Sequence, residues 1–254
     1  MVIPVWGLYL KSAAERLQPR QWLQPLVWAP SCILHGGSDD QKRALLPQVA
    51  GGEVLLALAL EESPHHQPYG AATTAEKSAN GYTITGGKKF VLDGHVANKI
   101  VVVARTAGQP GDRDGLTLVL VDQNAAGVTT TRTIMADSRN AANIQFDSAE
   151  GELIGEAGKG AEVLDKALDI GRVLLAAEML GGVQECFERT VEYLKVREQF
   201  GVPIGSFQGL KHRAAQMFCE VELSKSVVLE ALAALDEDSD EIAELASLAK
   251  TRLN

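Results

Sequence analysis

Cysteine is scarce in this sequence. Its 254 residues include three cysteines, Cys32, Cys186 and Cys219, which are widely spaced and form no Cys-x-x-Cys pair. Such usage is typical of a reducing compartment. We therefore expect a cytoplasmic protein whose thiols are buried apolar side chains.

Long apolar runs are also missing. The longest clean one, Val54–Leu60, is much shorter than the roughly 18 residues that cross a bilayer, so it predicts a buried strand and no membrane span. The N-terminal stretch MVIPVWGLYLK has no basic residue before its apolar part, which argues against a signal peptide.

Positive charge is in deficit, with 24 Lys and Arg against 33 Asp and Glu and a formal net charge of −9. A nucleic-acid partner needs a basic face, so we expect none. The five histidines show no metal-ligand spacing, and no metal site is expected. His65 and His66 are predicted to be a solvent-exposed pair in a loop.

The sequence does have the composition of a soluble globular protein, with 46% apolar and 22% charged residues. Residues 1–52 are predicted to be helical. Ser38 and Gln41 have the spacing of a capping box, in which the serine accepts the N3 amide and the glutamine reaches back to the cap. An apolar stripe follows at helical spacing, and Gly51 ends this helix.

Residues 53–150 alternate between short β-rich runs and turn residues, which is typical of a small barrel or sandwich. Tyr82–Thr85 and Phe90–Leu92 flank Gly86–Lys89, and this pattern predicts a hairpin. Four further strands are predicted at Ile100–Ala104, Leu116–Val121, Val128–Thr131 and Ile144–Phe146.

In residues 151–254 the alternation gives way to apolar residues at helical spacing. A first long helix is predicted at about 163–197, a second at about 208–235 and a third from 242 onward. Long helices with short connections are typical of an antiparallel bundle. Three helices leave one apolar groove uncovered, so we expect this bundle to be incomplete.

The predicted fold class is therefore α+β. It comprises a partial N-terminal helical domain (1–52), a central β-barrel or sandwich domain (53–150) and an incomplete up-down helical bundle (151–254). Helices, then strands, then helices is an unusual order for one chain. Periodicity and spacing indicate this architecture but no activity.

Residues 193–217 read YLKVREQFGVPIGSFQGLKHRAAQM. This stretch resembles the signature of the acyl-CoA dehydrogenase family, in which an arginine, a polar residue two positions later, Phe-Gly, Pro-Ile and Phe-Gln occur in this order. Residues 40–62, 73–94 and 167–182 resemble three other parts of the family. In detail the chain is most similar to the small subunits of two-component enzymes such as pimeloyl-CoA dehydrogenase, shortened at both ends.

The resemblance implies an FAD-dependent oxidoreductase of fatty acid metabolism. A carboxylate base removes an α-proton of an acyl-CoA thioester while the β-hydrogen leaves as hydride to the flavin. The resemblance also implies electron-transfer flavoprotein or a similar electron acceptor as a partner. It further implies a homo- or hetero-oligomer built as a dimer of dimers.

Arg197 occupies the position of the family's pyrophosphate-binding arginine, which typically reaches the flavin of the neighbouring subunit. Gln199, Phe200, Phe207 and Gln208 would line the adenosine end. The alternative for Arg197 is a solvated residue at a helix C-terminus, where the helix dipole favours a cation. Phe200 and Phe207 are equally compatible with the protein core.

The resemblance places the flavin ring against two backbone segments. One is residues 57–63, which include Leu60 and Glu61, and the other is Phe90, Val91 and Leu92. The family's hydroxyl side chains that hydrogen-bond to the isoalloxazine are replaced here by Glu61 and Leu92, so backbone amides would have to serve the ring. Both segments are also compatible with strands that fill the core.

For the acyl-CoA, Asp169 and Arg172 resemble the family's pair on the first bundle helix. Their i, i+3 spacing equally allows a simple intrahelical ion pair. The catalytic base is missing from both places where the family carries it. One lies beyond Asn254, and the other, two residues after the aspartate, is Gly171. No catalytic residue is therefore assigned.

Two classes of function follow from these residues. In the first, the encoded protein is an FAD-dependent acyl-CoA dehydrogenase and this chain is a piece of it. In the second, the chain is a non-catalytic partner that completes a flavin site in a hetero-oligomer, or a relative that has lost its activity. An oxidase or a flavin monooxygenase on the same scaffold is a further alternative. Glu178 and Glu185, also on the first long helix, are expected to be surface or interhelix charges.

Overall fold

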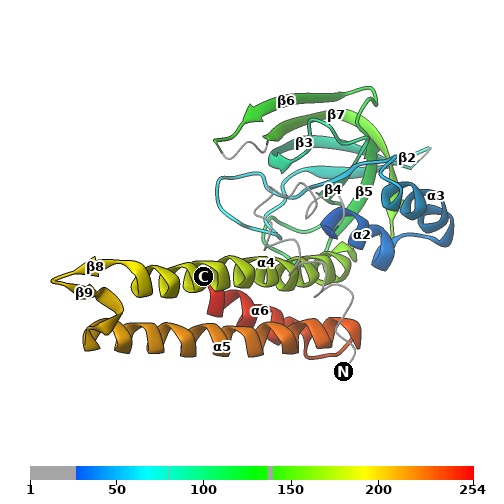
Figure 1. The fold of residues 1–254 in the computed structure, drawn as a ribbon. Coiled ribbons are helices and arrows are strands. Elements are labelled where there is room, and N and C mark those ends of the chain that lie inside the picture. Colours follow the sequence, from blue (N-terminus) through cyan, green and yellow to red (C-terminus); the bar gives the residue numbers. More distant parts are fainter. Residues whose placement is uncertain (1–26, 80, 137–139) are drawn as a thin grey trace. The chain divides into compact units, whose positions relative to one another are not determined.

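The chain forms helices, then strands, then helices, in the predicted α+β order (Figure 1). The computed structural model describes residues 27–79, 81–136 and 140–254, so most of the sequence expected to form the partial N-terminal domain lies outside the described residues. Two compact units are present, and the described residues up to Leu168 form one and Asp169–Asn254 the other. The domain limits proposed from the sequence, at 52 and 150, stay a prediction.

Within the described residues, two short helices precede the strands, α2 (Ala29–Gly36) and α3 (Asp39–Ala50). The capping box at the start of α3 is confirmed. The Gln41 amide donates to the Ser38 hydroxyl at 3.2 Å, and the Ser38 amide donates to the Gln41 side chain at 3.0 Å. Gly51 is the C-cap, as the sequence predicts. The side-chain amide of Gln41 also donates to the Leu153 carbonyl at 3.0 Å, which ties α3 to the end of a strand.

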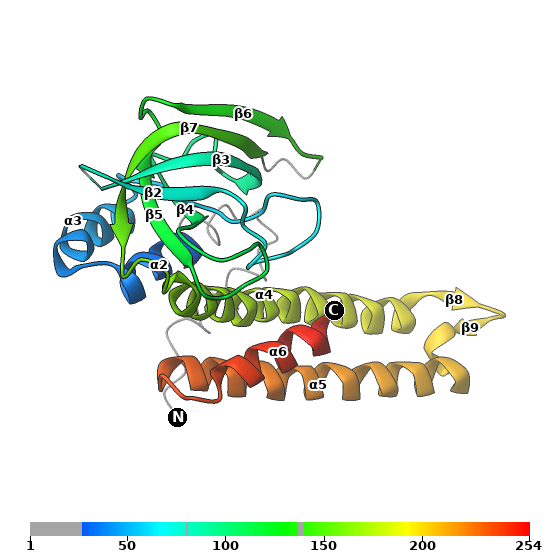
Figure 2. The same cartoon turned by 180° about the vertical axis from the view of Figure 1, so that it is seen from behind.

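Seven strands form one sheet, in which the path of pairing closes on itself (Figure 2). The strands are β1 (Leu56–Ala59), β2 (Thr74–Ser78), β3 (Gly81–Leu92), β4 (Lys99–Arg105), β5 (Leu116–Asp122), β6 (Val128–Ile134) and β7 (Asn140–Ile154). Around the closed path β4 pairs with β2, β2 with β3, β3 with β7, β7 with β5, and β5 with β4. β1 is added parallel to β4, and β6 is added antiparallel to β7. Of the two predicted β architectures, the barrel is the one formed.

Both faces of the central strands are buried, which explains their nearly continuous apolar sequence. In β1, Leu56 and Leu58 point into a core shared with α2, α3 and the start of α4 (Gly160–Val196). Ala57 and Ala59 alternate with them and join the residues of the second core, inside the barrel. Successive side chains of a strand point to opposite faces, so one strand serves both cores.

The hairpin predicted at Gly86–Lys89 is wrong. β3 runs unbroken through these residues, and the hairpin is formed instead by β2 and β3. Gly86, with φ +146°, sits at a register shift against β7, and an added Cβ would lie 2.5 Å from the Thr73 hydroxyl. The glycine therefore permits a close backbone approach and not a chain reversal.

The three helices predicted for the C-terminal half are confirmed. They are α4, α5 (Gln208–Asp236) and α6 (Ile242–Leu253). A small hairpin of β8 (Glu198–Gln199) and β9 (Val202–Pro203), followed by the 3-10 turn η2 (Ile204–Ser206), joins α4 to α5. In both views α5 runs back beside the second part of α4, and α6 folds against α5 (Figures 1 and 2).

The prediction of three buried thiols is wrong for two of them. Cys32 is buried in α2, and burial raises the pKa of its thiol to about 12. Cys186 and Cys219 are exposed on α4 and α5, in stretches of these helices that contain no buried residue. Within the described ranges no helix is both long and apolar enough to cross a membrane.

Candidate functional site

The end of β1 lies against the middle of β3. The amide of Lys89 donates to the Glu61 carbonyl at 2.7 Å, although 28 positions separate these residues. The structure thus brings Leu60 and Glu61 beside the segment that leads into Phe90–Leu92. These are the two backbone segments that the sequence predicts for the face of a flavin ring.

Phe90 has an unusual conformation at this place. Its φ is +51°, it lies in the register shift between Lys88 and Val91, and its side chain is 52% exposed despite being aromatic. Its amide donates to the Asn143 side chain at 3.3 Å. Positive φ in a bulky residue is uncommon and costs free energy, so the surrounding pairing must hold it.

Val91 and Leu92 differ from Phe90. Val91 is buried in the barrel core, and Leu92 pairs with Ala141 of β7. In the turn that follows, the Nδ1 atom of His95 is buried and has no hydrogen-bond partner among the residues that the structure describes. A buried polar atom without a partner is unfavourable, so this turn has an unused capacity for a hydrogen bond.

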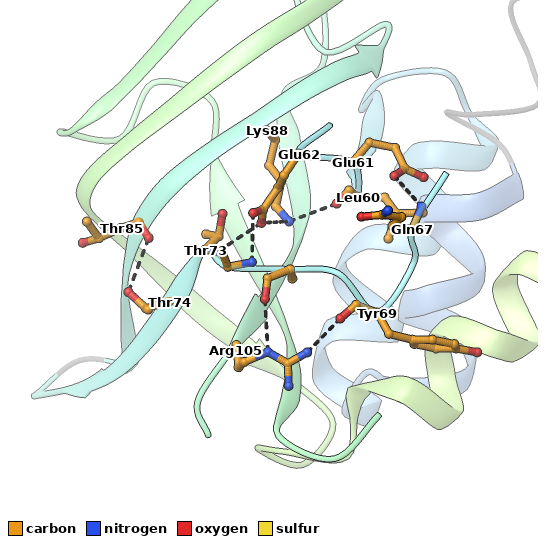
Figure 3. A network of polar contacts seen from close by, with 12 residues as sticks. Leu60, Glu61, Glu62, Gln67, Tyr69, Thr73, Thr74, Thr85, Lys88 and Arg105 are labelled. Carbon is orange, nitrogen blue, oxygen red and sulfur yellow. Dashed lines mark hydrogen bonds and ion pairs between the residues drawn. The ribbon is translucent and has the colours of Figure 1, made fainter. Parts of the chain in front are cut away.

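A buried ion pair joins Lys88 of β3 to Glu62, which follows β1 (Figure 3). The ammonium group of Lys88 is 2.7 Å from a carboxylate oxygen of Glu62 and donates to the Leu60 carbonyl at 3.0 Å. The Lys88 side chain is fully buried. Burial lowers the pKa of Lys88, and the negative charge of Glu62 opposes this shift.

Glu62 accepts hydrogen bonds from two main-chain amides as well as from Lys88. The amides of Ala72 and Thr73 donate to its carboxylate at 2.8 and 3.0 Å. Burial acts to raise the pKa of Glu62, but the charge and hydrogen bond of Lys88 and these two amides outweigh it, so the pKa is lowered. Glu62 therefore joins the end of β1, β3 and the loop before β2 at one point.

The side chain of Glu61 is turned toward its own loop. One carboxylate oxygen is 2.6 Å from Nδ1 of His66, and the other accepts the Gln67 amide at 3.1 Å. The exposed position of His65 and His66 in a loop is confirmed. The carboxylate of Glu61 is therefore engaged within its own loop, while its backbone carbonyl binds the Lys89 amide of β3.

Arg105 organises the loops beside this network. It is buried at the end of β4, and its guanidinium uses all five N–H groups on main-chain carbonyls. The acceptors are the carbonyls of Tyr69, Ala71, Ala107, Asp112 and Asp114. Figure 3 shows Arg105 below the strand end that carries Glu62.

A second polar cluster fixes the same loop. The Tyr69 hydroxyl donates to Asp165 at 2.6 Å and accepts from Arg113 at 2.7 Å, and Arg113 also pairs with Asp165. The Arg113 guanidinium lies 4.9 Å from the centre of the Tyr69 ring. The loop between β1 and β2 is thus anchored at Glu62, at the Tyr69 carbonyl and at the Tyr69 hydroxyl.

In the helical unit, the predicted phosphate-binding arginine stands at the base of the β8–β9 hairpin. Arg197 follows the last residue of α4, and its side chain is exposed without an ion pair among the described residues. Its carbonyl accepts the Ile204 amide at 2.7 Å, which closes the hairpin. The rings of Phe200 and Phe207 meet edge to face with centroids 6.1 Å apart.

The alternative of a core role for these aromatics is wrong for this chain. Phe200 has a positive φ at the hairpin tip and is 91% exposed, and Phe207 is 38% exposed. Gln199 lies exposed on β8, and Gln208 is the first residue of α5. The hairpin thus presents one cation, two amide side chains and two aromatic rings to solvent.

Asp169 and Arg172 form the intrahelical ion pair that their spacing allows, at 2.5 Å. Asp169 is largely buried, and Arg172 is about one-third exposed. Gly171, between them, is buried and carries no side chain that could act as a base. Glu185 pairs with Arg189 on the surface of α4 at 2.5 Å, as expected of a surface charge.

Sequence reasoning missed the polar network of the barrel unit. Its members are Glu62, His66, Tyr69, Lys88, Arg105, Arg113 and Asp165. One signal was available, because Lys88 lies in a strand between positions that face the core. Its partner could not be read from the sequence, since 26 positions separate Lys88 from Glu62.

Comparison with known proteins agrees with this architecture. Residues 59–149 match the acyl-CoA dehydrogenase middle domain, and residues 158–254 match the acyl-CoA dehydrogenase C-terminal domain. Together these two matches cover most of the chain, one over the barrel strands and one over the helices. The chain belongs to the acyl-CoA dehydrogenase family.

Individual relatives lie within the same family. An acyl-CoA dehydrogenase of Bacillus subtilis is 33% identical over 206 residues, which are 78% of this chain and 54% of the relative. Isovaleryl-CoA dehydrogenase of Arabidopsis thaliana is 31% identical over 204 residues, 77% of this chain and 49% of the relative. The chain therefore spans about half the length of these relatives.

A solved structure shares the fold over nearly the whole chain. Butyryl-CoA dehydrogenase from Megasphaera elsdenii superposes with a TM-score of 0.86 at 25% identity. The superposition covers 97% of this chain and 67% of the enzyme.

Proposed function

We propose that this chain provides the FAD-binding scaffold for the α,β-dehydrogenation of an acyl-CoA thioester. One observation carries the proposal. The backbone of Leu60 and Glu61 lies against the start of the Phe90–Leu92 segment, joined by the hydrogen bond from Lys89 to Glu61. Two irregular backbone segments at one point can offer amide and carbonyl groups to the polar edge of a flat ring.

Residues of each unit suit a different part of an FAD. In the barrel unit, Phe90 is exposed at a strand irregularity, and the buried Nδ1 of His95 is an unused polar atom nearby in sequence. In the helical unit, Arg197 is an exposed cation with a planar fork suited to the pyrophosphate of a neighbouring subunit's FAD. When bound, FAD would supply the acceptor for the β-hydrogen, as hydride.

For the substrate, we propose that Asp169 and Arg172 hold polar groups of the acyl-CoA. Their ion pair supports this in one respect, because each side chain fixes the orientation of the other. The partly exposed guanidinium keeps donors for an incoming group. The two charges also neutralise each other, so this site would orient a ligand more than attract it.

A second candidate function is a non-catalytic subunit that completes a flavin site in a hetero-oligomer. Gly171 favours it, because the position that carries a base in one branch of the family has no side chain here. In this case the base would come from other protein. Electron-transfer flavoprotein or a similar acceptor, and an assembly of at least two chains, belong to both candidates.

Purified protein separates these possibilities. We expect FAD to bind with a stoichiometry near one per chain and to be released on denaturation. Addition of short-chain, medium-chain or branched acyl-CoA under anaerobic conditions then tests whether the flavin band bleaches. Bleaching would show that this chain dehydrogenates acyl-CoA alone, binding without bleaching is expected where the base comes from other protein, and no binding refutes both candidates.

A further inference from the structure

Lys88 is a charged side chain in an unusually closed place. It is among the largest fully buried side chains of the described residues, and both of its hydrogen bonds end on residues that follow β1. One bond goes to the carboxylate of Glu62 and the other to the main-chain carbonyl of Leu60 (Figure 3). Removing an ammonium group from water costs free energy, and the hydrogen bonds to Glu62 and Leu60 must offset this cost.

The next residue, Lys89, also binds the segment that follows β1. The amide of Lys89 donates to the Glu61 carbonyl, so two consecutive residues of β3 bind the three residues that directly follow β1. The register of β3 shifts directly after Lys88, and Phe90 takes its positive φ there. Lys88 thus lies where the Leu60–Glu61 segment contacts the Phe90–Leu92 segment, the two segments that the proposed function assigns to the flavin.

We propose that Lys88 is a positioning residue of the flavin site, which holds the backbone of Leu60–Glu62 in register with Lys89 and Phe90. This inference rests on the proposed function. Backbone groups bind a rigid ring well only if their spacing is fixed in advance. Small displacements of the residues that support them weaken the binding. If the contact between these two segments were flexible, the barrel would still fold, but the backbone groups of the two segments would adopt many arrangements.

A purely structural role makes a different prediction. If Lys88 only neutralises Glu62, removal of both charges should leave the site intact. The double variant Lys88→Met/Glu62→Gln removes both charges. The amides of Ala72 and Thr73 bind different carboxylate oxygens of Glu62, so the glutamine keeps an acceptor for one of them, whereas the Leu60 carbonyl loses its donor. Replacement of a buried pair by neutral residues is often tolerated by the fold.

The test compares FAD binding by the intact chain, the double variant and the control Lys77→Met. The control removes an exposed ammonium group of β2, outside the two segments assigned to the flavin. We expect the control to match the unmodified chain. We expect the double variant to bind FAD at least about tenfold more weakly, with a shifted visible absorption band and midpoint potential of the bound flavin. Unchanged affinity, spectrum and potential would overturn the proposal.

Two further measurements keep the test decisive. Amide hydrogen exchange of the flavin-free protein should accelerate at residues 60–63 and 88–92 in the double variant, and not in β4 and β5. If the unmodified chain binds no FAD, the proposed function fails, and unchanged exchange would refute the role of Lys88 separately. If the double variant does not fold, Glu62→Asp keeps both charges but shortens the reach. Normal FAD binding by that variant would refute the proposal.

Discussion

At the scale of single residues, Lys88 and Glu62 form an ion pair in which the lysine side chain is fully buried. Removal of one partner leaves the other charge buried, and this is the costly change for such pairs. We predict that Glu62→Gln lowers the free energy of unfolding by about 3 kcal/mol. Urea denaturation of the two proteins measures this. Asp122→Asn, which breaks the exposed pair with Lys99, is the control and should cost less than about 1 kcal/mol.

The same residue predicts how stability depends on pH. The pKa of Glu62 is lowered in the folded state, so the unfolded state binds a proton first as the pH falls. The stability from Glu62 is therefore present at neutral pH and is lost as the pH falls through its lowered pKa. Unfolding free energies between about pH 6 and about pH 3 should show a smaller acid loss in Glu62→Gln. Equal slopes in both proteins would contradict this assignment.

Arg197 allows a prediction on the cofactor. Its side chain is exposed and has no ion pair within the described residues, so its loss should leave the fold unchanged. We predict that Arg197→Ala weakens FAD retention about 10- to 100-fold, as expected for a lost charged hydrogen bond. Flavin content after gel filtration measures this. Arg189→Ala, which removes a surface arginine of α4, should retain flavin like the unmodified chain.

At the scale of elements, β3 holds the least predictable part of the fold. Gly86 has a positive φ, and an added Cβ would lie 2.5 Å from the Thr73 hydroxyl. We predict that Gly86→Ala lowers the free energy of unfolding by about 2–3 kcal/mol. Gly52→Ala is the control, because its φ is +75° but no atom lies within 4 Å of the new Cβ. It should cost about 1 kcal/mol, and equal losses in the two variants would show that contact with Thr73 is unimportant.

The helical elements were easier to predict than the strands. The capping box of Ser38, the helix that ends near Arg197 and the helix that begins at Gln208 all lie where the sequence places them. The first depends on a capping box, and all three depend on apolar residues three or four positions apart. Strand pairing depends on partners far along the chain, and the hairpin at Gly86–Lys89 was therefore misplaced.

At the scale of the whole molecule, the central question is whether this chain alone can turn over a substrate. No base is found at Gly171, and the described carboxylates near the two flavin-facing segments are engaged by partners. We predict that the isolated chain reduces no artificial electron acceptor with any acyl-CoA, although it binds FAD. Steady-state assays over acyl groups of several lengths measure this. Reduction at a rate above that of free flavin would contradict the prediction.

The sequence by itself determined the order of the elements, the limits of the long helices and the membership of the family. These properties rest on local signals, such as caps, apolar periodicity and the stretch around Arg197. Only the tertiary structure decided that β3 is unbroken, that Phe90 is exposed, that Glu61 turns to His66, and that Lys88 meets Glu62. The reason is physical. Barrel closure brings together residues far apart in sequence, and the burial of a charge is acceptable only where that closure supplies its partner.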